Sequence, residues 1–346
     1  MESNGLNDVP DGQHTVTLKE VAEAAGVSIS TVSRILDERT PPSRSASAER
    51  VRKIAQSMGY RRNLFASMLR RGTTGTVGVV VPRLSDTVMA LMYEAIERAA
   101  KVRGYTAIVA TSGDDPEDEK IAAEALLSRN VEGLILASTQ LDDVFPEVLR
   151  RAAVPYALVL RTDGKSPSSL GDDETGGYLA VRHLIDLGHR DIGLVTGPSF
   201  ASSARDRLTG ARKALEEAGI SIDPLRIAGE GYRIEHGLAA GEKLMRAKEV
   251  KPTAIFAAND NLALGVMSAA HQHGMRIGED LALVGYNDIP LVSALPVPLT
   301  SVRVPFDQIA TTTFELLLSP ATSNPIRRAM PTLIPRASTG AFRPTP

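Results

Sequence analysis

The apolar positions near the N-terminus predict three short helices. The first begins after Thr17, a residue that can cap a helix, and ends at Gly26. Ser28 can cap a second helix, and a third extends over residues 47–58. The apolar residues recur three or four positions apart: Leu18, Val21, Ala22 and Ala25; then Val32 and Ile35; then Val51, Ile54, Ala55 and Met58. This spacing, with the sharp turn between the first two helices, predicts a helix-turn-helix head over residues 17–60.

From residue 76 the pattern changes to short β-rich runs that alternate with helical segments. Strands are expected at 77–81, 105–110, 133–137, 156–160, 192–195, 254–257 and 281–284. Helices are expected at 89–102, 117–127, 144–152, 178–187, 206–218 and 262–273. Parallel strands joined by helical crossovers predict a doubly wound α/β fold whose ligands bind at the carboxyl ends of the strands. Two such series follow one another, and the cleft between two similar lobes is a natural pocket.

Composition narrows the class of protein. The chain has 346 residues, of which 43% are hydrophobic and 23% charged, as expected for a folded protein of two or three domains. It has no cysteine, which excludes a disulfide scaffold and cysteine-bound metals. No apolar run approaches the roughly 18 residues of a membrane helix, and residues 1–16 lack the features of a secretory signal. We expect a soluble, cytoplasmic protein with a disordered leader at 1–16, no cofactor and no membrane partner.

The formal net charge of −2 conceals a basic region near the N-terminus. Residues 1–72 hold 11 Lys/Arg and 8 Asp/Glu, which leaves 28 and 33 for the remainder of the chain. Residues 44–71 hold eight basic residues and one acid. Such a block is either a solvated face or an electrostatic footprint for a polyanion. Because it adjoins the helix-turn-helix pattern, we favour DNA binding over a plain three-helix bundle.

DNA binding would place the second helix in the major groove, where it presents side chains to base edges, with neighbouring residues on phosphates. The expected contacts from the head are Thr17, Leu18, Ser28, Ile29, Ser30, Thr31, Ser33 and Arg34. A hinge helix and linker are expected at residues 61–75, where two arginine pairs bracket eight residues, too few to hold a helix alone. This segment is either an ordinary linker or a helix that folds when two copies meet over the minor groove and Leu69 wedges between base steps.

Residues 16–36 carry a specific resemblance. The stretch VTLKEVAEAAGVSISTVSRIL resembles the head of the lactose-repressor/galactose-repressor (LacI/GalR) family, and Asn63, Ala66 and Leu69 match the hinge pattern of that family. The similarity implies a transcription regulator, a repressor, in which residues matching Ile29, Ser30 and Arg34 contact bases. It also implies that the leucine matching Leu69 opens the centre of a palindromic operator.

Two positions in this region depart from the family pattern. Arg62 stands where the family commonly has proline, and Pro41 and Pro42 lengthen the turn before the third helix.

The resemblance also implies the organisation of residues 76–346. They are expected to fold like periplasmic sugar-binding proteins, with three chain crossings near Thr162, Arg303 and Met330. The expected lobes are residues 76–162 with 304–329, and residues 163–303 with 330–343. Since one helix-turn-helix reads few base pairs, we expect a homodimer on a palindromic operator, whose affinity is set by a small sugar or sugar derivative in the cleft.

Several polar residues follow predicted strands and are candidates for the cleft. Asn259 can donate to a ligand hydroxyl or merely cap the next helix. Ser203 and Arg207 resemble a family segment that reaches the effector, and a guanidinium suits paired hydroxyls or a carboxylate. The alternative for Arg207 is an ion pair with Asp206 or a neighbour. Asp173 is either a cleft residue or a charge at a helix N-terminus.

Five further residues complete the predicted cleft or extend it. Tyr232 can stack on a sugar ring or simply pack between elements. Asn287 stands where the family usually has an aspartate, and because an amide donates as well as accepts, the ligand is expected to differ from a plain neutral sugar. Arg161 is a predicted effector contact, and Arg83 and Asp163 are additional candidates.

Catalytic motifs are missing from the sequence. It has no phosphate-binding loop, and residues 197–201 lack the final glycine of a nucleophile elbow. His271 and His273, two apart on a predicted helix, point away from each other and make a poor metal pair. A sugar-processing enzyme is therefore disfavoured. A solute-binding protein without DNA function would explain residues 76–340 but not the basic head.

Overall fold

The computed structural model describes residues 16–36, 43, 45–60, 74–221, 223–246, 251–319 and 326–340. It divides into two compact units, Met1–Thr74 and Gly75–Pro346. The expected leader before residue 16 and the hinge residues Asn63, Ala66 and Leu69 lie outside the described residues. No helix in the described ranges is long and apolar enough to cross a membrane.

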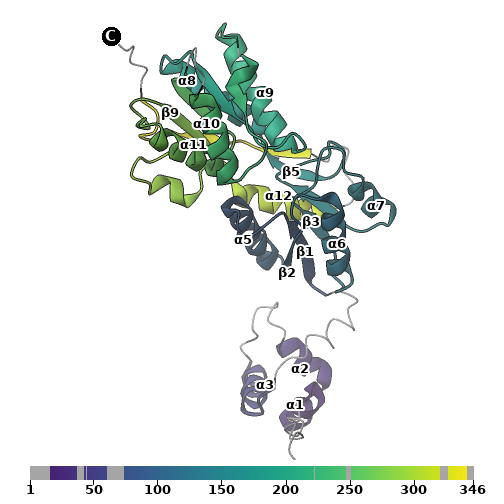
Figure 1. Ribbon diagram of the computed structural model, residues 1–346. Helices are drawn as coiled ribbons and strands as arrows, with labels where there is room; N and C mark the ends of the chain where they lie inside the picture. Colours follow the sequence, from purple (N-terminus) through teal and green to yellow (C-terminus); the bar gives the residue numbers. More distant parts are fainter. Residues whose placement is uncertain are drawn as a thin grey trace, which may run out of the picture. The chain divides into compact units, whose positions relative to one another are not determined.

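The head consists of three helices around a small apolar core (Figure 1). They are α1 (Leu18–Ala25), α2 (Ile29–Ile35) and α3 (Ala46–Ser57). The buried side chains are Val21, Ala22, Ala25, Val32, Val51 and Ala55. The predicted helix-turn-helix is therefore confirmed, with small shifts at the helix ends.

Local capping fixes where these helices begin. Thr17 Oγ1 accepts from the backbone N–H of Glu20 at 3.3 Å, and the Thr17 N–H donates to the Glu20 carboxylate at 2.6 Å, which completes a capping box. The side-chain oxygens of Ser28 and Ser45 cap α2 and α3 in the usual way, each at 3.2 Å from a backbone nitrogen. Gly26 ends α1 with a φ of 64°, which glycine adopts without steric cost.

The second unit contains two lobes, each built on a six-stranded sheet (Figure 1). The first lobe comprises β1 (Thr76–Val81), α5 (Thr87–Val102), β2 (Thr106–Thr111), α6 (Pro116–Leu127), β3 (Leu134–Leu136), α7 (Phe145–Arg151), β4 (Tyr156–Val159), β5 (Ser168–Gly171), α12 (Phe306–Leu318) and β11 (Ile326–Ala329). The second comprises α8 (Asp173–Asp186), β6 (Ile192–Val195), α9 (Ser202–Glu217), η1 (Pro224–Arg226), β7 (Ile227–Ala228), α10 (Ile234–Met245), β8 (Ala254–Ala257), α11 (Asp260–Gln272), β9 (Ala282–Asn287), η2 (Pro290–Ser293), β10 (Thr300–Arg303) and β12 (Thr332–Ile334).

The two sheets share one topology. Their strand orders are β11-β5-β4-β3-β1-β2 and β12-β10-β9-β8-β6-β7, and all strand pairs are parallel except β10 with β12. Right-handed crossovers place α5 on one face of the first sheet and α6 and α7 on the other. The same rule places α9 opposite α10 and α11 in the second sheet. This confirms the predicted doubly wound architecture.

The strands of the first lobe bury side chains on both faces. Val77, Val79 and Val81 of β1 share a core cluster with α5 and α12, whereas Val80 lies in a second cluster with α6 and α7. Because helices cover both faces, β1 reads as a continuous apolar run rather than as an alternating pattern. The carboxyl ends of the strands are left free to carry polar residues.

The first chain crossing lies later than the expected position near Thr162. β5 still pairs with β4 and β11, so the chain leaves the first sheet only after Gly171. The sequence hides this strand because Ser168 and Ser169 read as loop residues, yet both are buried. Ser168 Oγ is hydrogen-bonded to Thr162 Oγ1 at 2.8 Å, and Ser169 Oγ donates to the Ile309 carbonyl at 2.9 Å. The other two crossings lie at residues 304–305 and 330–331.

Candidate DNA-binding head and ligand cleft

The second helix of the head has one buried and one exposed side. Val32 is fully buried in the head core, whereas Ile29 is 44% exposed. Ser30 and Arg34 are also exposed, and Ser33 is half-buried. An exposed isoleucine beside serine and arginine on a short capped helix is suited to base-edge contacts, where apolar and hydrogen-bonding groups are both needed.

Other predicted DNA contacts cap helices or pack against the core within the head. Thr17 and Ser28 cap α1 and α2. Thr31 Oγ1 lies 2.8 Å from Ser28 Oγ, and Leu18 packs against the head core. These residues position α1 and α2, and any contact with phosphate would be additional to that role.

The basic block is partly committed to internal contacts. Arg50 donates to the Ala25 carbonyl at the end of α1 at 2.5 Å, and Arg52 donates to the Ser43 carbonyl at 2.7 Å. Both arginines therefore tie α3 to neighbouring backbone. The sequence gives no sign of this, because their partners are carbonyls set by tertiary packing.

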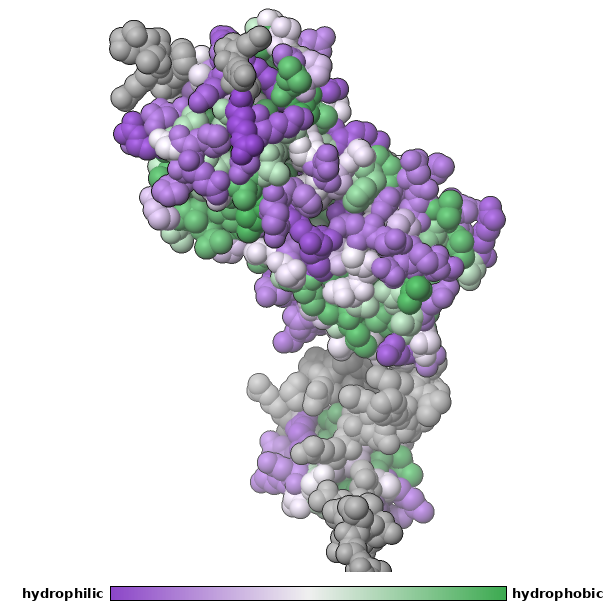
Figure 2. Space-filling view, viewed as in Figure 1, coloured by the Kyte–Doolittle hydropathy of each residue, from purple (hydrophilic) through white to green (hydrophobic). Residues whose placement is uncertain are grey.

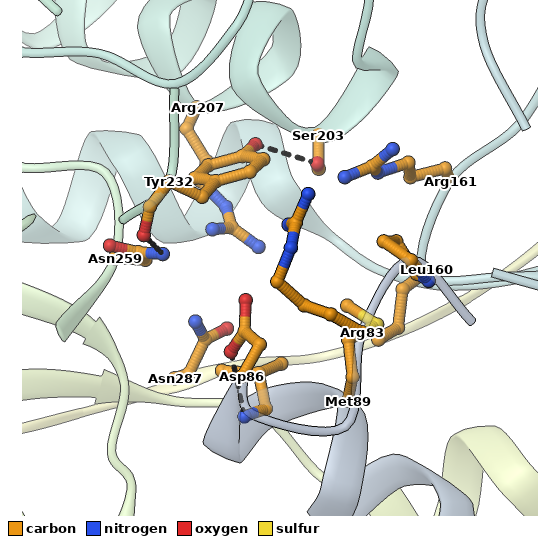
Figure 3. A pocket seen from close by; sticks show the side chains of 12 residues that line it. Arg83, Asp86, Met89, Leu160, Arg161, Ser203, Arg207, Tyr232, Asn259 and Asn287 are labelled. Atoms are coloured by element: carbon orange, nitrogen blue, oxygen red, sulfur yellow. Dashed lines mark hydrogen bonds between the residues drawn. The ribbon is translucent and has the colours of Figure 1, made fainter. Parts of the chain in front are cut away.

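A polar cleft lies where the strand ends of the two lobes face each other. It encloses about 450 Å³ of space, part of it open to solvent. All six predicted effector residues line it: Arg161, Ser203, Arg207, Tyr232, Asn259 and Asn287. The remaining lining residues come from the first lobe: Pro82, Arg83, Asp86, Val88, Met89 and Leu160. Figure 2 shows mainly hydrophilic side chains around the junction of the lobes, and Figure 3 shows the cleft from close by.

Arg207 is fixed by a buried ion pair. Its Nε donates to Asp173 Oδ1 at 2.8 Å, one terminal nitrogen donates to the Ala258 carbonyl at 2.6 Å, and its guanidinium lies 3.8 Å from the centre of the Tyr286 ring. Burial lowers the pKa of Arg207, but the Asp173 carboxylate and the two nearby tyrosines outweigh it, so the net pKa is raised. The ion pair with Asp206 considered from sequence is not formed by Arg207, because Asp206 pairs with Arg205.

Tyr232 joins several cleft residues. Its hydroxyl lies 2.9 Å from Ser203 Oγ, and its carbonyl accepts from the Asn259 amide at 3.0 Å (Figure 3). The Arg161 guanidinium lies 5.8 Å from the Tyr232 ring centre and 5.7 Å from that of Phe200. These distances are within the range of cation–π attraction.

Two asparagines behave differently in the cleft. Asn259 caps α11, because its Oδ1 accepts from the Leu262 N–H at 2.7 Å. Asn287 ends β9 with a φ of 98° and lines the cleft. Leu160, across the cleft, also has a positive φ of 63°. Strained backbone of this kind is typical of ligand sites.

Arg83, Asp86 and Arg161 are the charged residues that the first lobe contributes to the cleft, and Asp114 pairs with both arginines. Arg83 pairs tightly with Asp114, and Arg161 contacts the same carboxylate at 3.4 Å. Asp86 caps α5, accepting from the Val88 N–H at 3.0 Å, and contacts the Asn261 amide of the second lobe at 3.4 Å. Burial raises the pKa of Asp86, and its hydrogen bond to Val88 opposes that rise.

Asp86 and the apolar residues of this wall were not among the residues predicted from the sequence. The only available signal was their position in the loop and first helical turn after β1. Asp163, an additional candidate, does not line the cleft; it accepts from the backbone N–H groups of Lys165 and Ser166 in its own loop. No cluster of three or more potential metal ligands occurs among the described residues.

Comparisons with known proteins match both units. Residues 17–63 match the model for bacterial regulatory proteins of the lacI family, and residues 181–339 match a periplasmic binding protein-like domain. The transcriptional repressor PurR of Vibrio atlanticus is 31% identical over 308 residues, covering 87% of this chain and 91% of the relative. The chain belongs to the lacI family of bacterial regulatory proteins. As a lacI-family member it is a DNA-binding transcription regulator and not an enzyme.

Two further lacI-family proteins show the same extent of similarity. The ribose operon repressor of Escherichia coli is 30% identical and covers 87% of this chain and 92% of its own length. A Lac repressor dimer bound to operator and the anti-inducer ONPF is 29% identical, with a TM-score of 0.79 over 94% of this chain and all of that one. Because head and core both align, a solute-binding protein without a DNA function is excluded.

Proposed function

We propose that this lacI-family regulator is a homodimeric repressor that binds a palindromic operator in the cytoplasm, on nucleoid DNA. The exposed side of α2 carries this proposal, because Ile29, Ser30 and Arg34 are presented on a helix that caps and core packing hold in place. A relative has been crystallised as a dimer on its operator. Twofold pairing of two heads matches the twofold symmetry of a palindrome.

The hinge residues Asn63, Ala66 and Leu69 supply a second set of DNA contacts in this proposal. They would act at the centre of the operator, where Leu69 separates base steps in the minor groove. Replacing Leu69 with Ala is expected to weaken specific binding more than non-specific binding. Equal losses on both DNAs, measured by fluorescence anisotropy, would remove the wedge from the proposal.

The effector in this proposal is a sugar or sugar derivative held between the lobes. Residues of both lobes line the cleft, and Asp86 already contacts Asn261 across it, so a ligand that touches both sides changes the free energy of closure. A ligand with different affinity for two conformations shifts their populations and, reciprocally, the affinity for DNA.

Operator binding is tested on the full chain by selection from genomic fragments at moderate salt. The recovered site is then compared for the wild type, Arg34→Ala and the control Arg98→Ala, an exposed arginine paired with Asp307 in the second unit. Loss of a base contact is expected to reduce specific affinity by about 1–3 kcal/mol in Arg34→Ala and to leave the control unchanged. No preference for any fragment would overturn the proposed function.

A further inference from the structure

The turn at residues 198–202 of the second lobe contacts the first lobe directly. It follows β6 and leads into α9, and within it the Ala201 N–H donates to the Pro198 carbonyl at 3.1 Å. Phe200 is partly buried, yet it belongs to none of the three apolar core clusters among the described residues. Phe200 therefore does not serve the core of its own lobe, and its contacts with the first lobe need a separate explanation.

Three contacts of this turn pass from one lobe to the other. The Phe200 carbonyl accepts from the Leu141 N–H at 3.0 Å. Ser202 Oγ accepts from the Thr162 N–H at 2.9 Å. The Arg161 guanidinium lies 5.7 Å from the centre of the Phe200 ring, within the range of cation–π attraction. Thr162 and Ser202 are each 2% exposed and Arg161 is 3% exposed, so water competes little for these contacts.

Both sides of the contact are fixed within their own lobes. In the first lobe, the segment before Leu141 is held because Thr139 donates to the buried Glu119 carboxylate at 3.0 Å. The Gln140 amide also donates to the Asp114 carbonyl at 2.7 Å. In the second lobe, the turn is bounded by β6 and α9. Breaking the contact therefore requires the lobes to move apart, since neither segment is free to fold back.

The contact lies beside the ligand cleft. Of its five residues, Arg161 alone is among the described residues that line the cleft, and Figure 3 shows its guanidinium pointing toward Ser203. The three chain crossings allow the lobes to rotate about hinges, so contacts elsewhere decide how closely the lobes approach. The turn can supply such contacts without using the space that a ligand would fill.

We propose that Phe200 and Ser202 form a latch that holds the two lobes closed through contacts of the protein itself, with Arg161 and the Thr162 amide as its counterpart on the first lobe. The latch sets the fraction of closed molecules before a ligand binds. A ligand that binds only the closed cleft gains apparent affinity in proportion to that fraction. The inference adds to the proposed function, and it can be tested without DNA or effector.

The distance between the lobes provides the test. Because the chain has no cysteine, the substitutions Glu124→Cys on α6 and Lys213→Cys on α9 allow selective spin labelling of one exposed position on each lobe. The labelled full chain is mixed with an excess of unlabelled chain, so that double electron–electron resonance reports distances within one protomer. With an intact latch we expect a single distance.

The double variant Phe200→Leu/Ser202→Ala removes the aromatic ring and the acceptor for the Thr162 N–H. In the closed state this amide would be buried without a partner, whereas opening hydrates it. The ratio of closed to open molecules is expected to fall at least about tenfold, so that a second, longer distance appears. Phe200→Tyr keeps a ring beside Arg161 and is expected to keep the single distance.

Arg103→Met is the matched control. The Arg103 guanidinium lies 5.8 Å from the Phe314 ring within the first lobe, so this substitution breaks the same kind of contact without affecting the junction of the lobes. It is expected to leave the single distance unchanged. Thermal melting verifies that each labelled variant is folded at the temperature of measurement. If the double variant does not melt cooperatively, Phe200→Leu and Ser202→Ala are measured singly, with the longer distance expected in each.

Three results would overturn the latch. They are the same single distance without the latch residues as with them, an equally large change in Arg103→Met, and a predominantly long distance while the latch is intact. Selection of an operator does not enter any of these measurements. Failure of that selection would overturn the proposed function and leave the latch standing, so the two proposals can fail separately.

Discussion

The two lobes share a topology but contribute differently to the cleft. The second lobe provides residues that are tied to the protein itself, as Arg207 is to Asp173 and Asn259 is to the Tyr232 carbonyl. The first lobe provides Arg83, whose side chain is 22% exposed and whose partner Asp114 is 29% exposed. The second lobe therefore supplies a fully buried ion pair to the cleft, whereas the first lobe supplies the buried Arg161 and the partly solvated Arg83, which share the Asp114 carboxylate.

Helix packing explains part of this difference. In the second lobe α8 and α9 approach closely through glycines, since a Cβ on Gly177 would meet the Arg207 backbone at 2.1 Å and one on Gly210 would meet the Glu174 carbonyl at 1.8 Å. In the first lobe α5 and α12 pack through larger side chains such as Met92 and Phe314. Backbone-on-backbone contact fixes the α9 turn that carries Arg207.

The largest expected effect comes from breaking the buried ion pair. Arg207→Met leaves Asp173 buried without its partner, which is expected to lower the free energy of unfolding by about 3–5 kcal/mol. Urea denaturation at neutral pH measures it. Arg98→Met, which breaks an exposed ion pair with Asp307, is expected to cost about 0–1 kcal/mol. Equal costs in the two variants would contradict the contrast between a buried frame and a solvated surface.

The same arginine is expected to govern the response to ligand. Arg207→Met should lose the ligand-dependent change in operator affinity while still binding operator, provided that the variant is assayed below its melting temperature. Unchanged ligand affinity would remove Arg207 from the site.

Each lobe also buries one carboxyl group whose pKa is raised to about 7 by burial: Glu119 in the first and Asp260 in the second. Glu119 accepts from Ser138 and Thr139, and its ordinary pKa is 4.5. Between pH 4.5 and about 7 the Glu119 carboxyl keeps a proton in the folded state that it has lost in the unfolded state. The contribution of Glu119 to the free energy of unfolding is therefore largest below pH 4.5. This contribution falls by at most about 3 kcal/mol as the pH rises through about 7.

Glu119→Gln removes the ionisation and is expected to flatten the pH dependence of urea denaturation and to stabilise the protein above pH 7. Asp260→Asn is expected to help less, because one partner of Asp260 is the Ile289 backbone N–H, which can only donate, whereas both partners of Glu119 are hydroxyls that can accept from an amide instead. A pH profile identical to wild type in Glu119→Gln would show that Glu119 ionises normally in the fold.

Close helix packing in the second lobe is tested by Gly210→Ala. The added methyl group meets a backbone carbonyl, and overpacking of this kind typically costs about 1–3 kcal/mol. Thr209→Ala, an exposed neighbour on α9, is expected to change stability within about 0.5 kcal/mol. Tolerance of the alanine at 210 in a thermal melt would mean that α8 and α9 separate easily.

The smallest effect is expected on the first-lobe side of the cleft. Arg83→Ala leaves Asp114 in contact with Arg161, so chemical denaturation should detect a loss below about 1 kcal/mol. A loss as large as that of Arg207→Met would mean that both walls of the cleft are equally rigid.

The sequence predicted those features that depend on short-range contacts or on a position shared with the family. Caps at Thr17 and Ser28 and the turn at Gly26 follow from short-range chemistry, and the six predicted effector contacts all line the cleft, although the additional candidate Asp163 does not. It was uninformative where partners are set by tertiary contacts. Asp173 as the partner of Arg207, and Arg50 as a tie to the end of α1, depend on how helices meet.

One glycine packs directly against a side chain of the cleft without lining the cleft itself. A Cβ on Gly197 would lie 2.3 Å from the Tyr232 ring, so any larger residue there must displace the aromatic ring. A displaced ring would change both the contact of its hydroxyl with Ser203 and the space for a bound molecule. Substitution of Gly197 can therefore change the size of ligand that the cleft accepts, although Gly197 is not itself a lining residue.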